Sequence, residues 1–335
     1  MTVDEQPLDP ERPVIDPHHH LWEFFPAPGS MHAADRFLLP EFLTMIANSG
    51  HNFTHTVFVE CRTMYRRDGP PELRQLGEIE FVNGVAAMSA SGNYGHCRVA
   101  HRIVGSADPG LGAGIARVLE RYISAAGERF RGLRFPTAFS EGGMFGTPCD
   151  PGLRHAMLNP QFRQAARVLA KMDLSLDIWC FHTQLAEVVD LATATPNLAI
   201  VLDHVGTPEY LGAYAGRGAE AQAEWKQKIL ELARRPNVVV KLGGLGMDLS
   251  KMIGDTGSQR SEALAAKWRD TIETCIEAFT PQRCMFESNF PPDKASTSYG
   301  ATWNAFKIIA RNYSEAEKDW LFRRTAAKTY RIALD

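Results

Sequence analysis

Short apolar or β-branched runs alternate along the chain with longer stretches of helical periodicity. Continuous apolar runs such as Leu198–Leu202 and Val238–Leu242 are typical of parallel strands that are covered on both faces. Eight segments predict strands: Val14–Asp16, Thr54–Glu60, Val99–Val104, Gly132–Phe135, Leu174–Trp179, Leu198–Asp203, Val238–Leu242 and Cys284–Glu287.

The stretches between these strands carry apolar residues three and four positions apart, which predicts amphipathic helices. The clearest are Gln161–Met172, Ala221–Arg234 and Ser261–Phe279. Ser314–Leu334 predicts a closing helix, because Ser314 and Glu317 have the spacing of a capping box.

Strands that alternate with helices predict an α/β fold with a parallel sheet, and the number of strands favours a single-domain (β/α)8 TIM barrel. A doubly wound open sheet is the alternative fold. We expect residues 1–12 to be a lead-in and residues 13–335 to form the barrel. The Gly-rich and Pro-rich segments Thr137–Pro151 and Gly243–Gln259 are expected to be functional loops, since they follow the fourth and seventh strands.

Composition excludes several classes of protein. A net charge of −3 gives no basic surface for nucleic acid, and no apolar run reaches the ~18 residues of a membrane span. The first residues lack the pattern of a signal peptide, so we expect a cytoplasmic protein. The six cysteines show no CxxC pairs and are expected to be reduced structural residues.

Histidines at predicted strand ends are the strongest chemical signal. In the segment Val14–Trp22, His18 and His20 lie on one face of an extended chain, because side chains alternate with period two. His182 follows the fifth strand, and Asp203 with His204 follows the sixth. Singly, each histidine is compatible with an ordinary polar role, but together they converge on the carboxyl face of a barrel, where active sites lie.

The sequence IDPHHHLW, the later LDHVG and the terminal MFESNFP resemble the amidohydrolase superfamily, specifically its branch of 2-pyrone-4,6-dicarboxylate lactonases and sugar lactonases. The resemblance covers nearly the whole chain, from Val14 to about Tyr330. It implies a cation held by His18, His20 and His182, and a role for His204 in activating water.

One position departs from that family pattern. The resemblance implies an aspartate after the eighth strand, where this chain has Asn289. An asparagine can neither accept a proton nor add negative charge to a metal. Two alternatives therefore stay open: one divalent cation, zinc or manganese, on the three histidines, or a metal-free site with His204 as general base. Glu60, Asp203, Glu287 and Asp293 are the acids that could replace the missing carboxylate.

Charged and aromatic residues near the same strand ends are candidates for binding the substrate. Arg62 and Arg134 could grip a carboxylate, and each could equally form an ion pair within the barrel. The remaining candidates are Glu60, Lys241 and Trp22.

Together these features predict an enzyme, a hydrolase that opens a small carboxylated or polyhydroxylated lactone with activated water. His204, Asp203 and Asn289 are its expected catalytic residues. The alternatives are a metal-dependent decarboxylase of an aromatic acid and a barrel that binds a small molecule without turnover. We expect a small-molecule substrate, no nucleic-acid or membrane partner, and a homo-oligomer.

Overall fold

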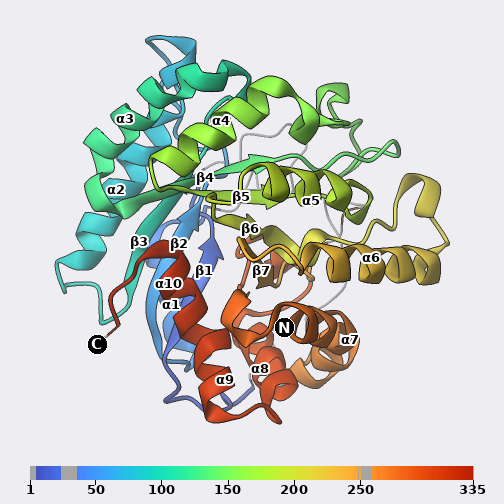
Figure 1. Ribbon diagram of the computed structural model, residues 1–335. Coiled ribbons are helices and arrows are strands. Elements are labelled where there is room, and N and C mark those ends of the chain that lie inside the picture. Colours follow the sequence, from blue (N-terminus) through green and yellow to red (C-terminus); the bar gives the residue numbers. More distant parts are fainter. Residues whose placement is uncertain (1–4, 24–35, 248, 250–258, 335) are drawn as a thin grey trace.

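Eight parallel strands stand side by side in chain order in the computed structural model, which describes residues 5–23, 36–247, 249 and 259–334 (Figure 1). The sequential order confirms the predicted (β/α)8 barrel, because a doubly wound sheet would place strands out of order. The strands are β1 Val14–His19, β2 Phe53–Val59, β3 Arg98–Gly105, β4 Phe130–Pro136, β5 Ser175–Trp179, β6 Ile200–Leu202, β7 Val238–Leu242 and β8 Cys284–Phe286.

The segment that follows β8 brings the last strand back against the first. His19 forms a parallel bridge with Phe290. The backbone N–H of Asn289 donates to the carbonyl of His18 at 3.0 Å, and that of His20 donates to the carbonyl of Phe290 at 2.8 Å. These contacts close the sheet at its carboxyl end and join the first histidine pair to the region of Asn289.

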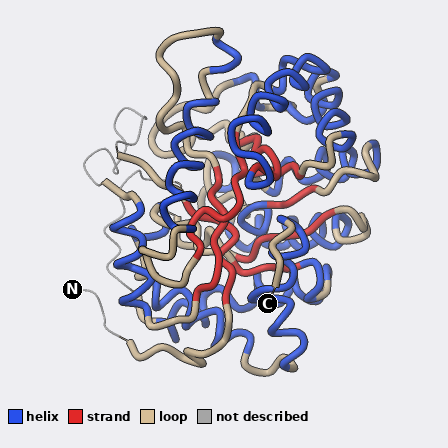
Figure 2. The backbone as a smooth tube through the Cα atoms, turned by 90° about the vertical axis from the view of Figure 1, so that its left-hand side faces the viewer, coloured by secondary structure: helices blue, strands red, loops and turns tan. Residues whose placement is uncertain are grey.

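Helices surround the strands, which gather at the centre of the molecule (Figure 2). The outer α-helices are α1 Leu39–Ser49, α2 Leu76–Ala90, α3 Ile115–Ala126, α4 Pro160–Lys171, α5 Leu185–Ala194, α6 Gly218–Leu232, α7 Ser261–Phe279 and α8 Tyr299–Ala310. The predicted closing helix is present as α9 Glu315–Asp319, a π-helical turn Trp320–Arg324 and α10 Thr325–Tyr330. The predicted capping box of Ser314 and Glu317 is confirmed.

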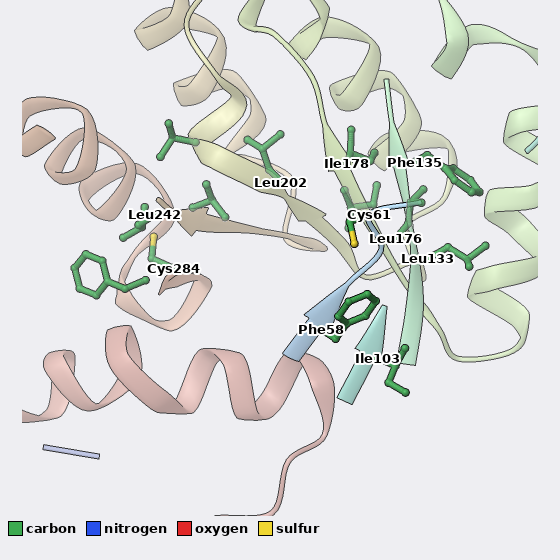
Figure 3. Packing of buried hydrophobic residues seen from close by; sticks show 14 of the residues in the cluster. Phe58, Cys61, Ile103, Leu133, Phe135, Leu176, Ile178, Leu202, Leu242 and Cys284 are labelled. Carbon is green, nitrogen blue, oxygen red and sulfur yellow. The ribbon is translucent and has the colours of Figure 1, made fainter. Parts of the chain in front are cut away.

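The main hydrophobic core fills the space between the barrel and the helices. Leu133 and Phe135 of β4 and Leu176 and Ile178 of β5 are buried in it (Figure 3). Burying an aliphatic or aromatic side chain of this size contributes about 1.5–3 kcal/mol. Since side chains alternate along a strand, the residues between them, such as Asp177, point into the barrel.

The interior of the barrel contains an apolar cluster. Ile15, Val57 and Val201 belong to a second buried cluster that includes Tyr330 of α10. The terminal helix therefore packs against the interior of the barrel, and the Tyr330 hydroxyl donates from there to Asp177 Oδ2 of β5 at 2.6 Å.

Among the described residues, no helix has the length and apolar character needed to cross a bilayer. All six cysteines are free. Of the loop predicted at Gly243–Gln259, residue 248 and residues 250–258 lie outside the described residues, as do residues 1–4 of the predicted lead-in.

Candidate active site

Three buried imidazoles meet at the carboxyl end of the barrel. The ring centroids of His18 and His20 are 4.9 Å apart, and those of His18 and His204 are 4.7 Å apart. His18 is fully buried, and 3% of His20 and 2% of His204 are exposed. The predicted convergence of the histidines after β1 and β6 therefore exists in the fold.

One carboxylate, Glu287 after β8, holds two of these rings. Its Oε1 accepts hydrogen bonds from the backbone N–H of His204 at 3.0 Å and from His204 Nδ1 at 2.7 Å. Its Oε2 lies 2.7 Å from His18 Nδ1. Burial would raise the pKa of Glu287, but the adjacent His204 and His18 outweigh it and hold this pKa well below its usual range. A carboxylate that stays ionised favours the proton on Nδ1 of both rings, so Nε2 of His204 is the basic atom.

The backbone around His204 is strained. His204 and Val205 both have φ of 54°, in the left-handed region that a β-branched residue rarely adopts. Trp225 Nε1 donates to the Val205 carbonyl at 2.7 Å and helps to hold the turn. A Cβ at Gly244 would lie 2.2 Å from His204 Nδ1, so only glycine leaves room for this ring. Strain of this kind, held by close packing, is characteristic of functional sites.

A buried ammonium lies beside the histidines. Lys241 Nζ of β7 lies 2.7 Å from Asp177 Oδ2, 3.0 Å from Asp203 Oδ1 and 3.2 Å from His18 Nδ1. All four side chains are fully buried. Burial opposes the charge on Lys241, but Asp177 and Asp203 outweigh it and keep its pKa above the ordinary value. The charge cluster inside the barrel thus includes a permanent cation.

Asp203, a predicted catalytic residue, lies at the centre of this charge cluster. Burial would raise its pKa, but Lys241, His204 and Arg134 outweigh burial and lower it. Neither of its oxygens accepts a hydrogen bond from the part of the chain that the structure describes, although Oδ1 lies 3.0 Å from Lys241 Nζ. Because a buried oxygen without a donor is costly, Asp203 is available to accept a hydrogen bond from a water molecule or a substrate hydroxyl.

The two predicted carboxylate-binding arginines have different environments. Arg134 is buried and bound to Glu60, with Nε 2.9 Å from Glu60 Oε1, while its Nη1 lies 3.4 Å from His18 Nε2. Arg134 is thus held by an internal partner. Arg62 is exposed, has φ of 63° and makes no ion pair or hydrogen bond with the described residues. Of the two, Arg62 is the guanidinium available to a ligand.

His182 lies apart from the other three histidines. Its Nδ1 accepts a hydrogen bond from the backbone N–H of Glu209 at 3.0 Å, its ring centroid is 4.8 Å from that of Tyr214, and its Nε2 lies 3.9 Å from Glu224 Oε2. Burial and Lys228 lower its pKa to about 4. None of the contacts among described residues joins it to His18 or His20, so the expected three-histidine site is not assembled here.

Asn289 supports the site through another acid. Its Nδ2 donates to Asp293 Oδ1 at 2.6 Å, and Asp293 Oδ2 accepts from the backbone N–H of Gly246 at 2.8 Å. Burial raises the pKa of Asp293 to about 7. Asn289 therefore ties the segment after β8 to the loop after β7, and Asp293 is the carboxylate nearest to it in these contacts.

Aromatic rings flank the histidines. The ring of Trp179 is 6.1 Å from that of His204, and Phe145 is 6.4 Å from Trp179. Trp22, a predicted substrate-binding residue, is buried and stacks 6.3 Å from His20. These rings provide an apolar border beside the polar cluster.

The cluster includes a set of atoms that could in principle hold a metal ion. One ligand atom each from His18, Asp203 and His204 lie within 4.8 Å of one another. Cations of the protein already face two of these residues, since Lys241 Nζ is 3.0 Å from Asp203 Oδ1 and an Arg134 nitrogen is 3.4 Å from His18 Nε2.

The positive charges of Lys241 and Arg134 would repel a metal ion bound to these residues. Zinc bound ~2.1 Å from the same carboxylate oxygen would stand within roughly 5 Å of the ammonium. At an effective dielectric constant of ~20, a divalent ion and an ammonium at that distance repel by about 7 kcal/mol. As arranged, the residues present do not fit a divalent cation.

Two members of the cluster were not singled out as site residues from the sequence. Glu287 was one of several candidate acids, and Asp177 lies within a strand that reads as core. An alternation argument could have found both. Asp177 and Lys241 are opposite charges at inward positions of their strands, and Glu287 follows the inward Met285 by two residues.

Comparisons with known proteins place the chain in a family. The amidohydrolase family model matches residues 15–332. An uncharacterised protein of Sinorhizobium fredii is 31% identical over 336 residues, which cover 95% of this chain and 98% of the relative. L-Fucono-1,5-lactonase of Burkholderia multivorans is 30% identical over 172 residues, which cover 51% of this chain and 56% of that enzyme.

Solved structures agree on the architecture. An amidohydrolase of Burkholderia multivorans, crystallised with bound HEPES, is 25% identical with a TM-score of 0.74, and the match covers 96% of this chain and 100% of that chain. A crystal of a Burkholderia multivorans amidohydrolase with bound zinc gives 24% identity and a TM-score of 0.73 over the same shares of the two chains. At this identity the likeness to the zinc-bound structure shows the fold alone.

Proposed function

The chain belongs to the amidohydrolase family and is an enzyme of hydrolase type; from that premise we propose that it opens the ring of a small lactone with a water molecule activated by His204. The observation that carries this proposal is the pair of hydrogen bonds from His204 to Glu287. A histidine whose Nδ1–H is held by a buried carboxylate has the arrangement of a general base.

The reaction follows from the groups that surround His204. Its Nε2 takes a proton from water while the water oxygen attacks the lactone carbonyl, and Glu287 stabilises the imidazolium that forms. The ring C–O bond then breaks, and the imidazolium returns the proton to the leaving alkoxide. Asp203 Oδ2, an acceptor without a donor among the described residues, is available to orient the water. The carboxylic acid product ionises and releases one proton for each ring opened.

The substrate class rests on three observations. The relative L-fucono-1,5-lactonase acts on a sugar lactone, as its name states. The partly exposed Trp179 ring beside His204 suits the face of a ring-shaped substrate. Arg62 offers an exposed guanidinium after β2 that would suit a carboxylate or several hydroxyl groups. We therefore propose a polyhydroxylated or carboxylated lactone as the substrate.

A panel of lactones tests the proposal. Sugar-acid lactones and carboxylated lactones are supplied to the purified protein, and proton release is followed with a pH indicator in weak buffer. We expect turnover of at least one member, and we expect His204→Asn to remove it. Arg62→Ala should raise KM for the carboxylated members more than for the neutral ones, and Arg67→Ala, another exposed arginine, is the matched control.

The two other functions expected from the sequence give different products. A decarboxylase would release carbon dioxide from an aromatic acid, and a binding protein would show ligand-induced stabilisation without any product. Neither is favoured by a specific contact in the site. Proton release without carbon dioxide would exclude both.

A further inference from the structure

Lys241 occupies a cation site built from several parts of the fold. Its Nζ lies 2.7 Å from Asp177 Oδ2 on β5, 3.0 Å from Asp203 Oδ1 after β6 and 3.2 Å from His18 Nδ1 on β1. The Tyr330 ring of α10 lies 5.6 Å from Nζ. Its hydroxyl donates to Asp177 Oδ2 at 2.6 Å.

This arrangement places a positive charge among the ligand atoms that a metal ion would need. Asp203 belongs both to the potential metal-ligand group and to the surroundings of the ammonium. His18, a second member of that group, is also within 3.2 Å of Nζ. An ion bound to the same carboxylate oxygen would be forced close to a charge of the same sign, in a region where no solvent screens the repulsion, since Lys241 is 0% exposed.

We propose that the ammonium group of Lys241 is the resident cation of this site and that it excludes a divalent metal ion from His18, Asp203 and His204. It replaces the charge of a metal by its ion pair with Asp203 Oδ1 at 3.0 Å, and both oxygens of this carboxylate still lack a hydrogen-bond donor among the described residues. The inference concerns the same site as the proposed function, but it does not depend on which reaction takes place there.

The proposal predicts that removal of one charge converts the site into a metal site. Lys241→Met keeps an unbranched side chain of similar length and deletes the ammonium. Asp177 and Asp203 would then be buried carboxylates without their cation, a state that strongly favours uptake of another cation. Zinc is the probe, because histidine and carboxylate ligands suit it.

The experiment measures zinc per chain. Untagged protein is stripped with chelator, incubated with one equivalent of zinc, desalted and analysed for metal. We expect the wild type to retain less than about 0.1 zinc per chain and Lys241→Met to retain about one. Zinc should also raise the melting temperature of the variant and leave that of the wild type unchanged.

Lys307→Met is the matched control. Lys307 is also largely buried and contacts a histidine, with Nζ 3.0 Å from His51 Nδ1, but its other partner is the carbonyl of Asp9. Its removal leaves no pair of buried carboxylates, so this variant should retain no zinc. If Lys241→Met does not fold, Lys241→Gln removes the same charge with a polar side chain.

Two results would overturn the proposal. One is about one zinc per chain in the stripped and reloaded wild type, a measurement that needs no variant. The other is a folded, neutral variant at position 241 that takes up no zinc. Both are read without substrate, so they leave the proposed lactone hydrolysis untouched, and failure to hydrolyse lactones leaves the zinc result untouched.

Discussion

Replacing Glu287 with glutamine removes the negative charge that joins His204 to His18. The size of the side chain is conserved, and Glu287 is fully buried, so solvent does not take over the role of the charge. His204 Nδ1 lies 2.7 Å from Oε1. At an effective dielectric constant of ~20, unit charges ~4 Å apart attract by about 4 kcal/mol. Loss of that stabilisation from the imidazolium would slow the reaction about 10³-fold, since each 1.36 kcal/mol is one decade.

The hydrogen-bond pattern adds to this loss. An amide has one acceptor oxygen, whereas Glu287 accepts from His204 with Oε1 and lies 2.7 Å from His18 Nδ1 with Oε2. In the variant an N–H group must face one of the two rings, and that ring must change its tautomer. The expected cost in the free energy of unfolding is about 1–3 kcal/mol, the penalty of an unsatisfied buried polar group.

The assay separates chemistry from binding. Steady-state proton release from the best lactone gives kcat and KM, and urea unfolding confirms that the variant is folded under assay conditions. We expect kcat to fall about 10³-fold with KM changed by no more than about threefold, because the charge acts on the transition state. Glu80→Gln, which removes an exposed carboxylate paired with Arg66, is the control and should leave both constants unchanged. A folded Glu287→Gln protein with kcat within about threefold of the wild type would refute the reasoning.

Three further predictions follow from single contacts. His204→Asn should lower kcat at least about 10²-fold and still fold, because asparagine tolerates the φ of 54° at this position; a wild-type rate in the lactone assay would remove His204 from the mechanism. Gly244→Ala should abolish turnover, because its Cβ would lie 2.2 Å from the His204 ring. Gly216→Ala is the control: Gly216 has φ of 76°, and a Cβ there would have no atom within 4 Å, so the substitution should cost only about 1 kcal/mol of stability. Equal activity of the two variants would contradict this reasoning. Burial raises the pKa of Asp293 to about 7, whereas its value in the unfolded chain is ~4. Between these two pH values the native state binds more protons than the unfolded state, so the contribution of this group to stability falls as pH rises from ~4 to ~7. Urea unfolding at pH 5 and pH 8 should therefore show Asp293→Asn gaining about 2.6 kcal/mol relative to the wild type between the two pH values, and an unchanged difference would be the contrary result.

The fold could be predicted well from the sequence because apolar periodicity determines it. β7 and α7 begin and end where the pattern predicts, at Val238–Leu242 and Ser261–Phe279. The sixth strand is shorter than expected and ends at Leu202, since Asp203–Gly206 forms a tight turn with left-handed residues. Such a turn depends on packing by distant residues such as Gly244, which no local pattern reveals.

The site could be predicted only in part. Position at a strand end predicted that His18, His20 and His204 would meet, and they do. The same argument failed to place His182 with them, because the direction of a side chain after a strand depends on the loop. Its backbone enters a short helical turn, and its ring is held by Glu209 and Tyr214.

The ion pairs inside the barrel could not be predicted from the local sequence pattern either. Arg134 was a candidate for binding a substrate carboxylate or for an internal ion pair, and its contact with Glu60 is the internal one. Lys241 was a candidate for binding the substrate, but it is buried within the barrel, and its partner Asp177 lies 64 residues away in the sequence. Such pairs are determined by the register of neighbouring strands, which only the assembled sheet provides.

Turnover of the lactone panel by the wild-type protein tests the central claim most directly. Proton release and carbon dioxide release are measured in parallel, with His204→Asn as the blank. The account predicts that at least one polyhydroxylated or carboxylated lactone releases one proton per ring opened, with no carbon dioxide and no proton release above background in the variant. Proton release that is the same in the wild type and the His204→Asn variant, or carbon dioxide release from aromatic acids without opening of any lactone, would contradict it.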